Sequence, residues 1–191
     1  MVGVRKFDRK KMKNAILYFL EHINNEHLGK TKMMKLLYYL DFDHYEQYGK
    51  SVTGDVYLRL PYGPVPKHGT EMLEQMADDD AILPVRGKSG PYNQQRYISE
   101  EATDLSVFDG SEVAQLEKVA ITWEHSTAAE MEQASHSEIP WLVAEAAHKS
   151  QLDYGMAQFR TPVGEEPEDK VFSTSPKFNN FVKKLAGKNE G

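Results

Sequence analysis

Residues 30–66 decide the fold, and they read KTKMMKLLYYLDFDHYEQYGKSVTGDVYLRLPYGPVP. From residue 31 to residue 48, apolar side chains occur on nearly every side of a helix, and such a helix is buried inside a domain. Glycine often follows the last turn of a helix, so Gly49 marks the predicted end of this one. The sequence therefore predicts a central helix over residues 31–48. Its apolar positions are Met33, Met34, Leu36, Leu37, Tyr38, Tyr39, Leu40, Phe42 and Tyr45.

Short strands are predicted after this helix. Residues 56–60 place large apolar side chains at every second position, which is the period of a strand. The segment Pro61–Pro66 contains three prolines, which predicts a rigid loop before the next helix. Within residues 82–98, ILPV and QRYI are joined by the turn-rich RGKSGPYN and predict a hairpin.

Further amphipathic helices are predicted on both sides. The first is capped by Asp8, and another begins at residue 109 or 111. Thr127 and Glu130 have the spacing of a capping box, and a corner over residues 136–140 leads into another short helix. The fold class expected from these elements is α+β: a mainly helical single domain around a central helix, with a small antiparallel sheet or hairpin.

A change of pattern near residue 160 predicts the domain boundary. Residues 1–159 are expected to form the domain, whereas residues 160–191 are expected to form an acidic linker and an amphipathic helix. Phe178 and Phe181 lie on the apolar side of that helix. Exposed apolar side chains gain from burial, so the helix is expected to dock on the domain, a second copy or another protein.

Composition narrows the class of protein. The 191 residues are 40% hydrophobic and 27% charged, which suits one globular domain. The absence of cysteine excludes disulfides and thiolate metal sites and fits a reducing compartment, so a cytoplasmic protein is expected. No apolar run approaches the length of a membrane span, and the first residues lack a signal-peptide pattern. The net charge of −6 disfavours nucleic acid as a partner.

One group of polar residues offers two interpretations. Asp41, His44 and Tyr48 share a face of the central helix and could form a metal or acid/base cluster. They could equally form a structural network in which Asp41 pairs with a basic or hydroxyl group across the core. We favour the network, because no HExxH ligand pattern and no GxSxG nucleophile motif occurs. We expect no catalytic residue, no metal and no cofactor, and therefore a protein that is not an enzyme.

Two segments and the spacing between them carry a family resemblance. In residues 30–66 the features are the Lys-x-x-Lys-Leu-Leu-Tyr-Tyr run and the Tyr-Gly-Pro-Val-Pro segment. In residues 126–141, STAAEMEQASHSEIPW, they are a helix start with Glu-Met and the Ser-His-x-Glu-x-Pro-Trp corner. In combination they resemble the Panacea domain, the shared core of SocA-like antitoxins, over residues 8–155. The tryptophan that family members often have close before the Gly-Pro pair is absent here.

The resemblance implies an antitoxin of a toxin–antitoxin system, with a prophage-associated setting. It would neutralise a protein toxin, encoded by an adjacent gene, through direct contact. The alternative that it implies is a proteolytic adaptor that delivers a partner to an ATP-dependent protease. A second copy of the chain is a further candidate partner. Partner specificity is expected in the hairpin around residues 86–94 and in the tail after residue 160, because neither has a counterpart in the resemblance.

Candidate residues follow from the pattern and the resemblance. Aromatic and apolar side chains on loops and terminal helices are typical anchors of interfaces. The candidate partner-binding residues are Tyr62, Val65, Tyr92, Phe178 and Phe181. Signature residues are expected to serve the structure: Leu37, Tyr38, Asp41, Gly63, Pro64, His136, Pro140 and Trp141.

Overall fold

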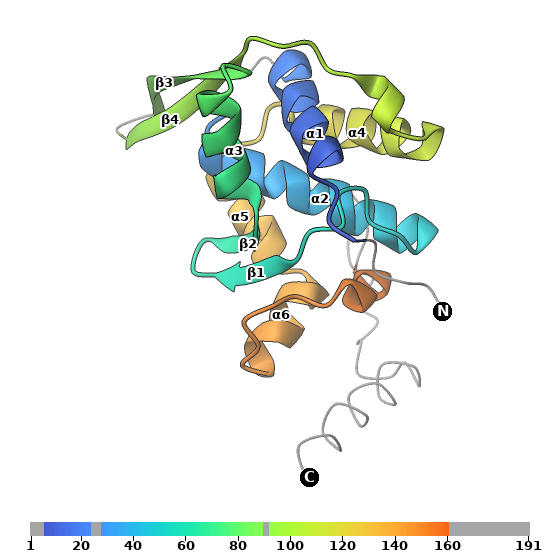
Figure 1. Ribbon diagram of the computed structural model, residues 1–191. Coiled ribbons are helices and arrows are strands. Elements are labelled where there is room, and N and C mark those ends of the chain that lie inside the picture. The colour runs from blue at the N-terminus through green and yellow to red at the C-terminus, as the bar shows by residue number, and fades with distance from the viewer. Residues whose placement is uncertain (1–5, 24–27, 90–91, 161–191) are drawn as a thin grey trace. The chain divides into compact units, whose positions relative to one another are not determined.

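The computed structural model describes residues 6–23, 28–89 and 92–160 (Figure 1). It confirms an α+β, mainly helical domain with two small antiparallel sheets of two strands each. The α-helices and strands are α1 (Arg9–His22), α2 (Lys30–Tyr48), β1 (Tyr57–Leu60), β2 (Gly63–Pro66), α3 (Gly69–Asp78), β3 (Ile82–Ser89), β4 (Tyr92–Ser99), α4 (Gly110–Trp123), α5 (Ala128–His136) and α6 (Ile139–Ala146). Short 3-10 helices occur at Leu105–Val107 and Tyr154–Phe159.

The predicted central helix is α2, and it passes through the middle of the domain (Figure 1). Helices α1, α4 and α5 and strand β2 pack against it. Every side chain from Lys32 to Phe42 is buried, including two lysines and an aspartate. Gly49 ends the helix with a φ of 69°, a left-handed conformation that glycine adopts without strain. Each large apolar side chain buried here contributes about 1.5–3 kcal/mol to folding.

Polar caps start three of the helices at the expected residues. The Asp8 side chain accepts a hydrogen bond from the Lys11 amide at the start of α1. Thr127 and Glu130 form the predicted capping box of α5. Asp109 caps α4 through a second capping box that the spacing alone had not singled out. These caps satisfy backbone amides that have no partner within the helix.

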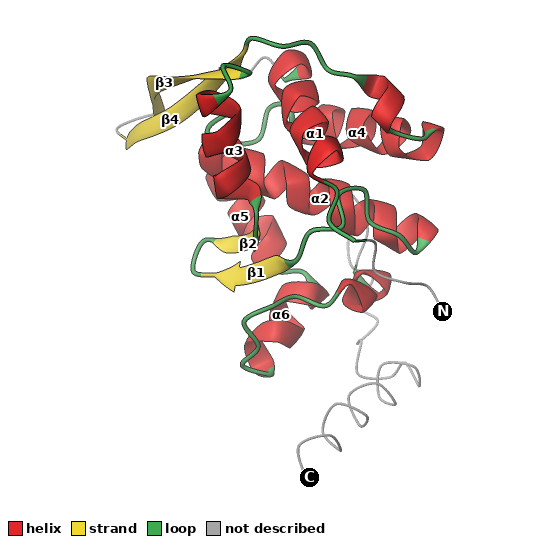
Figure 2. Ribbon diagram, viewed as in Figure 1, coloured by secondary structure: helices red, strands yellow, loops and turns green. Residues whose placement is uncertain are grey.

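The two hairpins lie toward one side of the helices (Figure 2). The prediction of a loop at Pro61–Pro66 was wrong, because Gly63–Pro66 forms β2 and pairs with β1. The predicted turn of the second hairpin was too long, since β3 and β4 continue to Ser89 and from Tyr92. On its outer side, β1 is bonded to residues 150–152, which fixes the first hairpin on that side as well.

The positions of the prolines explain how β2 can be a strand. The Lys67 amide donates to the Val56 carbonyl at 2.8 Å, so the odd-numbered residues of β2 turn their backbone groups toward β1. Pro64 and Pro66 fall on the alternate positions, whose backbone groups point away from β1. A strand can hold proline there because no N–H is needed. The edge of β2 that faces away from β1 therefore carries carbonyl groups, and α2 lies against this edge.

The described fold ends at Arg160. Contacts divide the chain into Met1–Arg160 and Thr161–Gly191, and Arg160 itself is buried, one residue beyond the boundary expected from the sequence. The expected acidic linker and the helix with Phe178 and Phe181 lie outside the described residues. None of the described helices combines the length and hydrophobicity that crossing a bilayer requires.

Candidate protein-interaction site

The segments with the sequence motifs meet around the ammonium group of Lys35. Lys35 is fully buried in α2, and its Nζ donates a hydrogen bond to the Pro64 carbonyl at 3.1 Å. A Cβ on Gly63 would lie 2.3 Å from this Nζ and 3.0 Å from Ser135 Oγ. Gly63 also has a φ of 97°, which disfavours any side chain. Helix α2, strand β2 and helix α5 are thus joined closely enough at this point to require glycine.

A second buried lysine of α2 holds the start of α5 in place. Lys32 Nζ donates to the carbonyls of Glu124 and Ser126, at 2.8 Å and 2.6 Å. Burial lowers the pKa of Lys32 to about 8, against the nearby charges of Glu124 and Glu130, which raise it. Burial likewise lowers the pKa of Lys35 to about 8, with Glu132 opposing. The two lysines of the Lys-x-x-Lys motif therefore hold the hairpin and α5 at the cost of burying two ammonium groups.

Replacing Lys35 should change how stability depends on pH. Its folded pKa of about 8 lies below the ordinary 10.5, so between these values the unfolded chain binds more protons and stability rises with pH. We expect Lys35→Met to reduce the gain in unfolding free energy between pH 8 and 10 by roughly 2 kcal/mol. Urea titrations at these two pH values measure it.

Lys32 supplies the internal comparison for this prediction. The pKa of Lys32 is lowered in the same way. The Lys35→Met variant should therefore keep part of the rise in unfolding free energy with pH, and the double variant with Lys32→Met should lose more of it. A Lys35→Met protein whose pH dependence equals that of the wild type would show that Lys35 stays charged in the folded protein.

The corner between α5 and α6 lies beside the same hairpin. The rings of His136 and Trp141 are 4.2 Å apart, and the guanidinium of Arg59 in β1 lies 5.8 Å from the Trp141 ring. Burial and the nearby charge of Lys35 lower the pKa of His136, and Glu132 opposes them. Pro140 occupies the first turn of α6, where a missing N–H costs nothing. His136, Pro140 and Trp141 thus shape the corner and support β1.

A buried ion cluster joins α2 and α6 to the last described residue. The Tyr38 hydroxyl donates to Glu138 at 2.6 Å, and Arg160 donates to Glu138 at 2.7 Å and to Asp43 at 2.6 Å. Burial raises the pKa of both carboxyl groups, while the Arg160 charge opposes the rise. The cluster therefore fixes α2, the start of α6 and the end of the described chain to one another.

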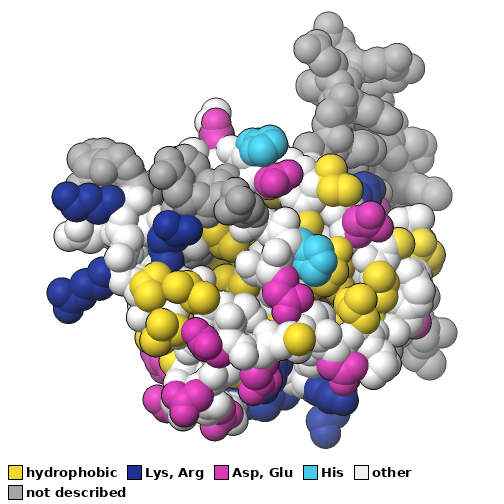
Figure 3. Space-filling view, turned by 90° about the horizontal axis from the view of Figure 1, so that it is seen from above, with side chains coloured by type: hydrophobic (Ala, Val, Ile, Leu, Met, Phe, Trp, Pro, Cys, Tyr) yellow, Lys and Arg dark blue, Asp and Glu magenta, His cyan; other side chains and the backbone are white. Residues whose placement is uncertain are grey.

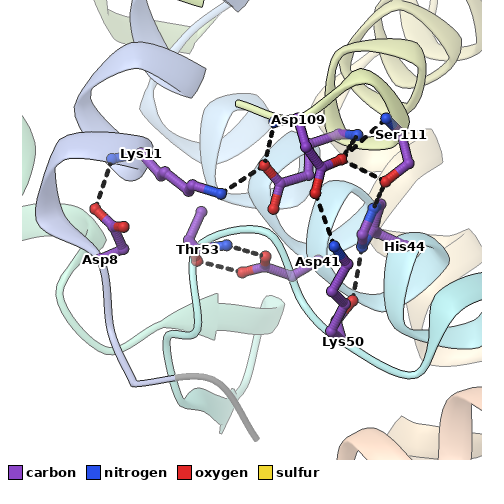
Figure 4. A network of polar contacts seen from close by, with 9 residues as sticks. Asp8, Lys11, Asp41, His44, Lys50, Thr53, Asp109 and Ser111 are labelled. Atoms are coloured by element: carbon purple, nitrogen blue, oxygen red, sulfur yellow. Dashed lines mark hydrogen bonds and ion pairs between the residues drawn. The ribbon is translucent and has the colours of Figure 1, made fainter. Parts of the chain in front are cut away.

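Asp41 and His44 bond to different partners and not to each other (Figure 4). Asp41 accepts hydrogen bonds from the amide and hydroxyl of Thr53 and from the Tyr57 hydroxyl. Burial raises its pKa to about 6 despite these donors. His44 donates through Nδ1 to the Lys50 carbonyl at 2.7 Å, and its Nε2 lies 3.0 Å from Ser111 Oγ. Across the described residues, no group of three or more histidine, aspartate or glutamate side chains could hold a metal ion.

Of the residues expected to bind a partner, two lie on the first hairpin. Tyr62 is 70% exposed in the turn between β1 and β2, and Val65 of β2 is half-buried. Leu60 of β1 is 42% exposed, and so is Leu142 of the neighbouring helix α6. Tyr92 begins β4 on the other hairpin, and its side chain lies outside the described residues, as do Phe178 and Phe181. The structure therefore separates Tyr62 and Val65 from Tyr92.

The sequence motifs contain Lys35 and Glu138, but neither of these residues, nor Arg160, was among the candidate site residues. Lys35, Glu138 and Arg160 are buried, and each bonds to a residue at least 22 positions away. Lys35 carried one usable signal, because it is a charged residue within a helix that is apolar on nearly every side. Arg160 carried none, since it stands where the apolar pattern ends.

Comparison with known proteins supports one family. The family model described as "Antitoxin SocA-like, Panacea domain" matches residues 33–142. No curated protein and no solved structure matches the chain. The matched range contains α2 from Met33 onward, both hairpins and the α5–α6 corner up to Leu142. Because it covers more than half of the sequence, the chain belongs to the family of SocA-like antitoxins with a Panacea domain.

Proposed function

We propose that this protein is a cytoplasmic antitoxin that neutralises a protein toxin by direct binding, without catalysing a reaction. The proposed binding surface is the turn of the β1–β2 hairpin with the adjoining face of α6. The observation that carries the proposal is the exposure of Tyr62, at 70%, on a hairpin whose two strands are both held from outside. Residues 150–152 pair with β1, and Lys35 bonds to β2.

This arrangement suits the recognition of a protein surface. Aromatic side chains contribute most at interfaces when their surroundings are already rigid, because little freedom is lost on binding. Tyr62 projects from such a base, and Leu60 and Leu142 add exposed apolar area. Membership of the antitoxin family suggests a toxin as the class of partner. The geometry supplies a surface on which an apolar pocket of that partner could close.

Removing the exposed ring should weaken toxin binding. We expect Tyr62→Ala to lower the affinity for the toxin by about tenfold to a hundredfold, as loss of an aromatic anchor does. Val65→Asp should have a similar effect in protein shown to be folded, because it places a charge on a half-buried position of the same hairpin. The measurements are rescue of growth in cells that express the product of the neighbouring gene, and titration calorimetry with the purified toxin.

Ile121→Ala is the matched control. Ile121 is 69% exposed, as much as Tyr62, but it lies on α4. This variant should rescue growth as the wild type does. Equal affinity and rescue in a folded Tyr62→Ala protein would move the binding surface elsewhere. The abundance of the toxin, followed in the same cells, separates direct neutralisation from delivery to a protease, because only delivery lowers it.

A further inference from the structure

The β3–β4 hairpin is a positively charged projection on an acidic protein. Residues 82–99 contain Arg86, Lys88 and Arg96 and no aspartate or glutamate, although the chain has a net charge of −6. Figure 3 shows Lys and Arg side chains projecting at the end of the molecule where this hairpin lies, next to a group of hydrophobic side chains. A concentration of one sign of charge attracts segments of the opposite sign.

Strand β3 forms an edge of its sheet. On one side, β4 pairs with β3. On the other side, β4 meets Gly29 through an isolated bridge at Arg96. Within residues 6–23, 28–89 and 92–160, no strand pairs with the outer side of β3. An edge strand presents backbone donors and acceptors to which an extended chain can bind.

The register shows which backbone groups point outward. The Glu100 amide donates to the Ala81 carbonyl at 3.0 Å, so the odd-numbered residues of β3 turn their backbone groups toward β4. Pro84, Arg86 and Lys88 are the alternate positions. All three direct a carbonyl away from β4, and Arg86 and Lys88 also direct an N–H there. This edge can therefore pair with an added strand along residues 84–88.

The two faces of the hairpin differ in chemistry. Leu83 and Ile98 form a cross-strand pair on one face and are 49% and 50% exposed, with Val85 next along the strand. Arg86 and Lys88 lie on the opposite face, because successive side chains of a strand alternate. A hollow of about 540 Å³ is lined by residues of both strands, Pro84, Val85 and Arg86 of β3 and Asn93, Gln94 and Gln95 of β4. Arg96 is paired with Val85 and therefore lies on the face of Leu83. That face offers apolar contacts together with one positive charge, and the opposite face offers the charges of Arg86 and Lys88.

We infer that β3 binds an extended segment of a partner protein as a third strand, and that acidic and apolar residues alternate in this segment. The apolar residues would lie beside Leu83 and Val85. The acidic residues would lie beside Arg86 and Lys88, away from Glu74 and Asp78, which border the base of that face together with Tyr97. This site lies apart from the β1–β2 hairpin, and the inference holds whether or not the partner is a toxin.

A second copy of this chain does not fit the same edge. Pairing two β3 strands side by side would bring the positive charges of Arg86 and Lys88 near those of the second copy, and like charges across a strand pair are destabilising. Pro84 removes one of the donors that a long self-paired ladder would use. The charges that oppose self-pairing favour an acidic strand.

Synthetic peptides test the inference directly on the full-length protein. The first probe is a labelled seven-residue peptide that alternates glutamate with valine, and its binding is followed by fluorescence anisotropy at low and high salt. One comparison peptide alternates lysine with valine. Two others have the sequence of the first probe with N-methyl groups on every second amide, on the glutamates in one peptide and on the valines in the other. The protein variants are Arg86→Glu with Lys88→Glu, and a charge-matched control, Lys67→Glu with Lys149→Glu, at two exposed lysines outside this hairpin.

If β3 accepts an acidic strand, the glutamate–valine peptide should bind, and its affinity should fall as the salt concentration rises. The Arg86/Lys88 variant should bind it about tenfold or more weakly, and the Lys67/Lys149 variant should lose much less. One of the two N-methylated peptides should fail to bind, because its pairing edge is blocked. Equal binding of the lysine–valine peptide, of both N-methylated peptides or of the Arg86/Lys88 variant would overturn the inference, as would no binding of the first peptide. None of these results depends on the Tyr62 experiment.

Discussion

Replacing Arg160 by methionine is expected to lower the free energy of unfolding by about 3–5 kcal/mol, because breaking a buried ion cluster leaves its other charges unpaired. Arg160 holds Asp43 and Glu138 in the interior, and its guanidinium also lies over the rings of Tyr38 and Tyr39. The methionine fills much of the volume but provides no donor. Urea denaturation at pH 7 measures the loss.

The deficit of this variant should shrink in acid. Burial raises the pKa of Asp43 and Glu138, and Arg160 opposes that rise, so the variant should raise both further. A carboxyl group whose pKa is raised in the folded protein destabilises the fold at a pH above this raised pKa. The destabilisation is lost as the pH falls toward about 4, the pKa of such a group in the unfolded chain. We therefore expect the difference between variant and wild type to be smaller at pH 5 than at pH 7.

Two further variants make the Arg160 experiment decisive. Adding Glu138→Gln to Arg160→Met should recover part of the stability, since one unpaired buried charge is removed. Arg9→Met should change stability little, because Arg9 pairs with Glu71 at the surface. If Arg160→Met were no more harmful than Arg9→Met, the end of the described chain would not be fixed by this cluster.

Replacing Trp141 by alanine is expected to cost a similar amount, about 3–5 kcal/mol, as truncation of large buried aromatic residues does. Trp141 is 5% exposed and its ring lies 4.2 Å from that of His136, so its loss would leave a cavity between the α5–α6 corner and β1. Thermal and urea denaturation measure the effect. Trp141→Phe, which keeps a ring, should cost less.

Leu142 provides the control on the same helix. It is 42% exposed, so Leu142→Ala should alter stability much less than Trp141→Ala while touching the proposed toxin-binding surface. A variant pair in which both changes had the same small effect on unfolding would contradict a supporting role for Trp141. Because loss of folding also abolishes binding, rescue assays with Trp141→Ala need a temperature at which the variant is still folded.

The sequence by itself determined the elements whose signals are local. The apolar run before Gly49 identified α2, the Thr127–Glu130 spacing identified the start of α5, and alternation identified β1. The motifs also indicated the family that the comparison then showed. Periodicity and capping depend on residues a few positions apart, and these are visible without the fold.

Only the tertiary structure decided what lies inside and what pairs across the fold. The prolines of β2 predicted a loop until the pairing with β1 placed them on the edge that needs no N–H. Arg160 stood at the start of the expected linker, yet it bonds to Asp43, 117 positions away. Lys35 and Pro64 are 29 positions apart. Such contacts depend on how distant segments pack, and burial then sets the pKa and the energetic weight of each charged group, so neither local pattern nor composition could reveal them.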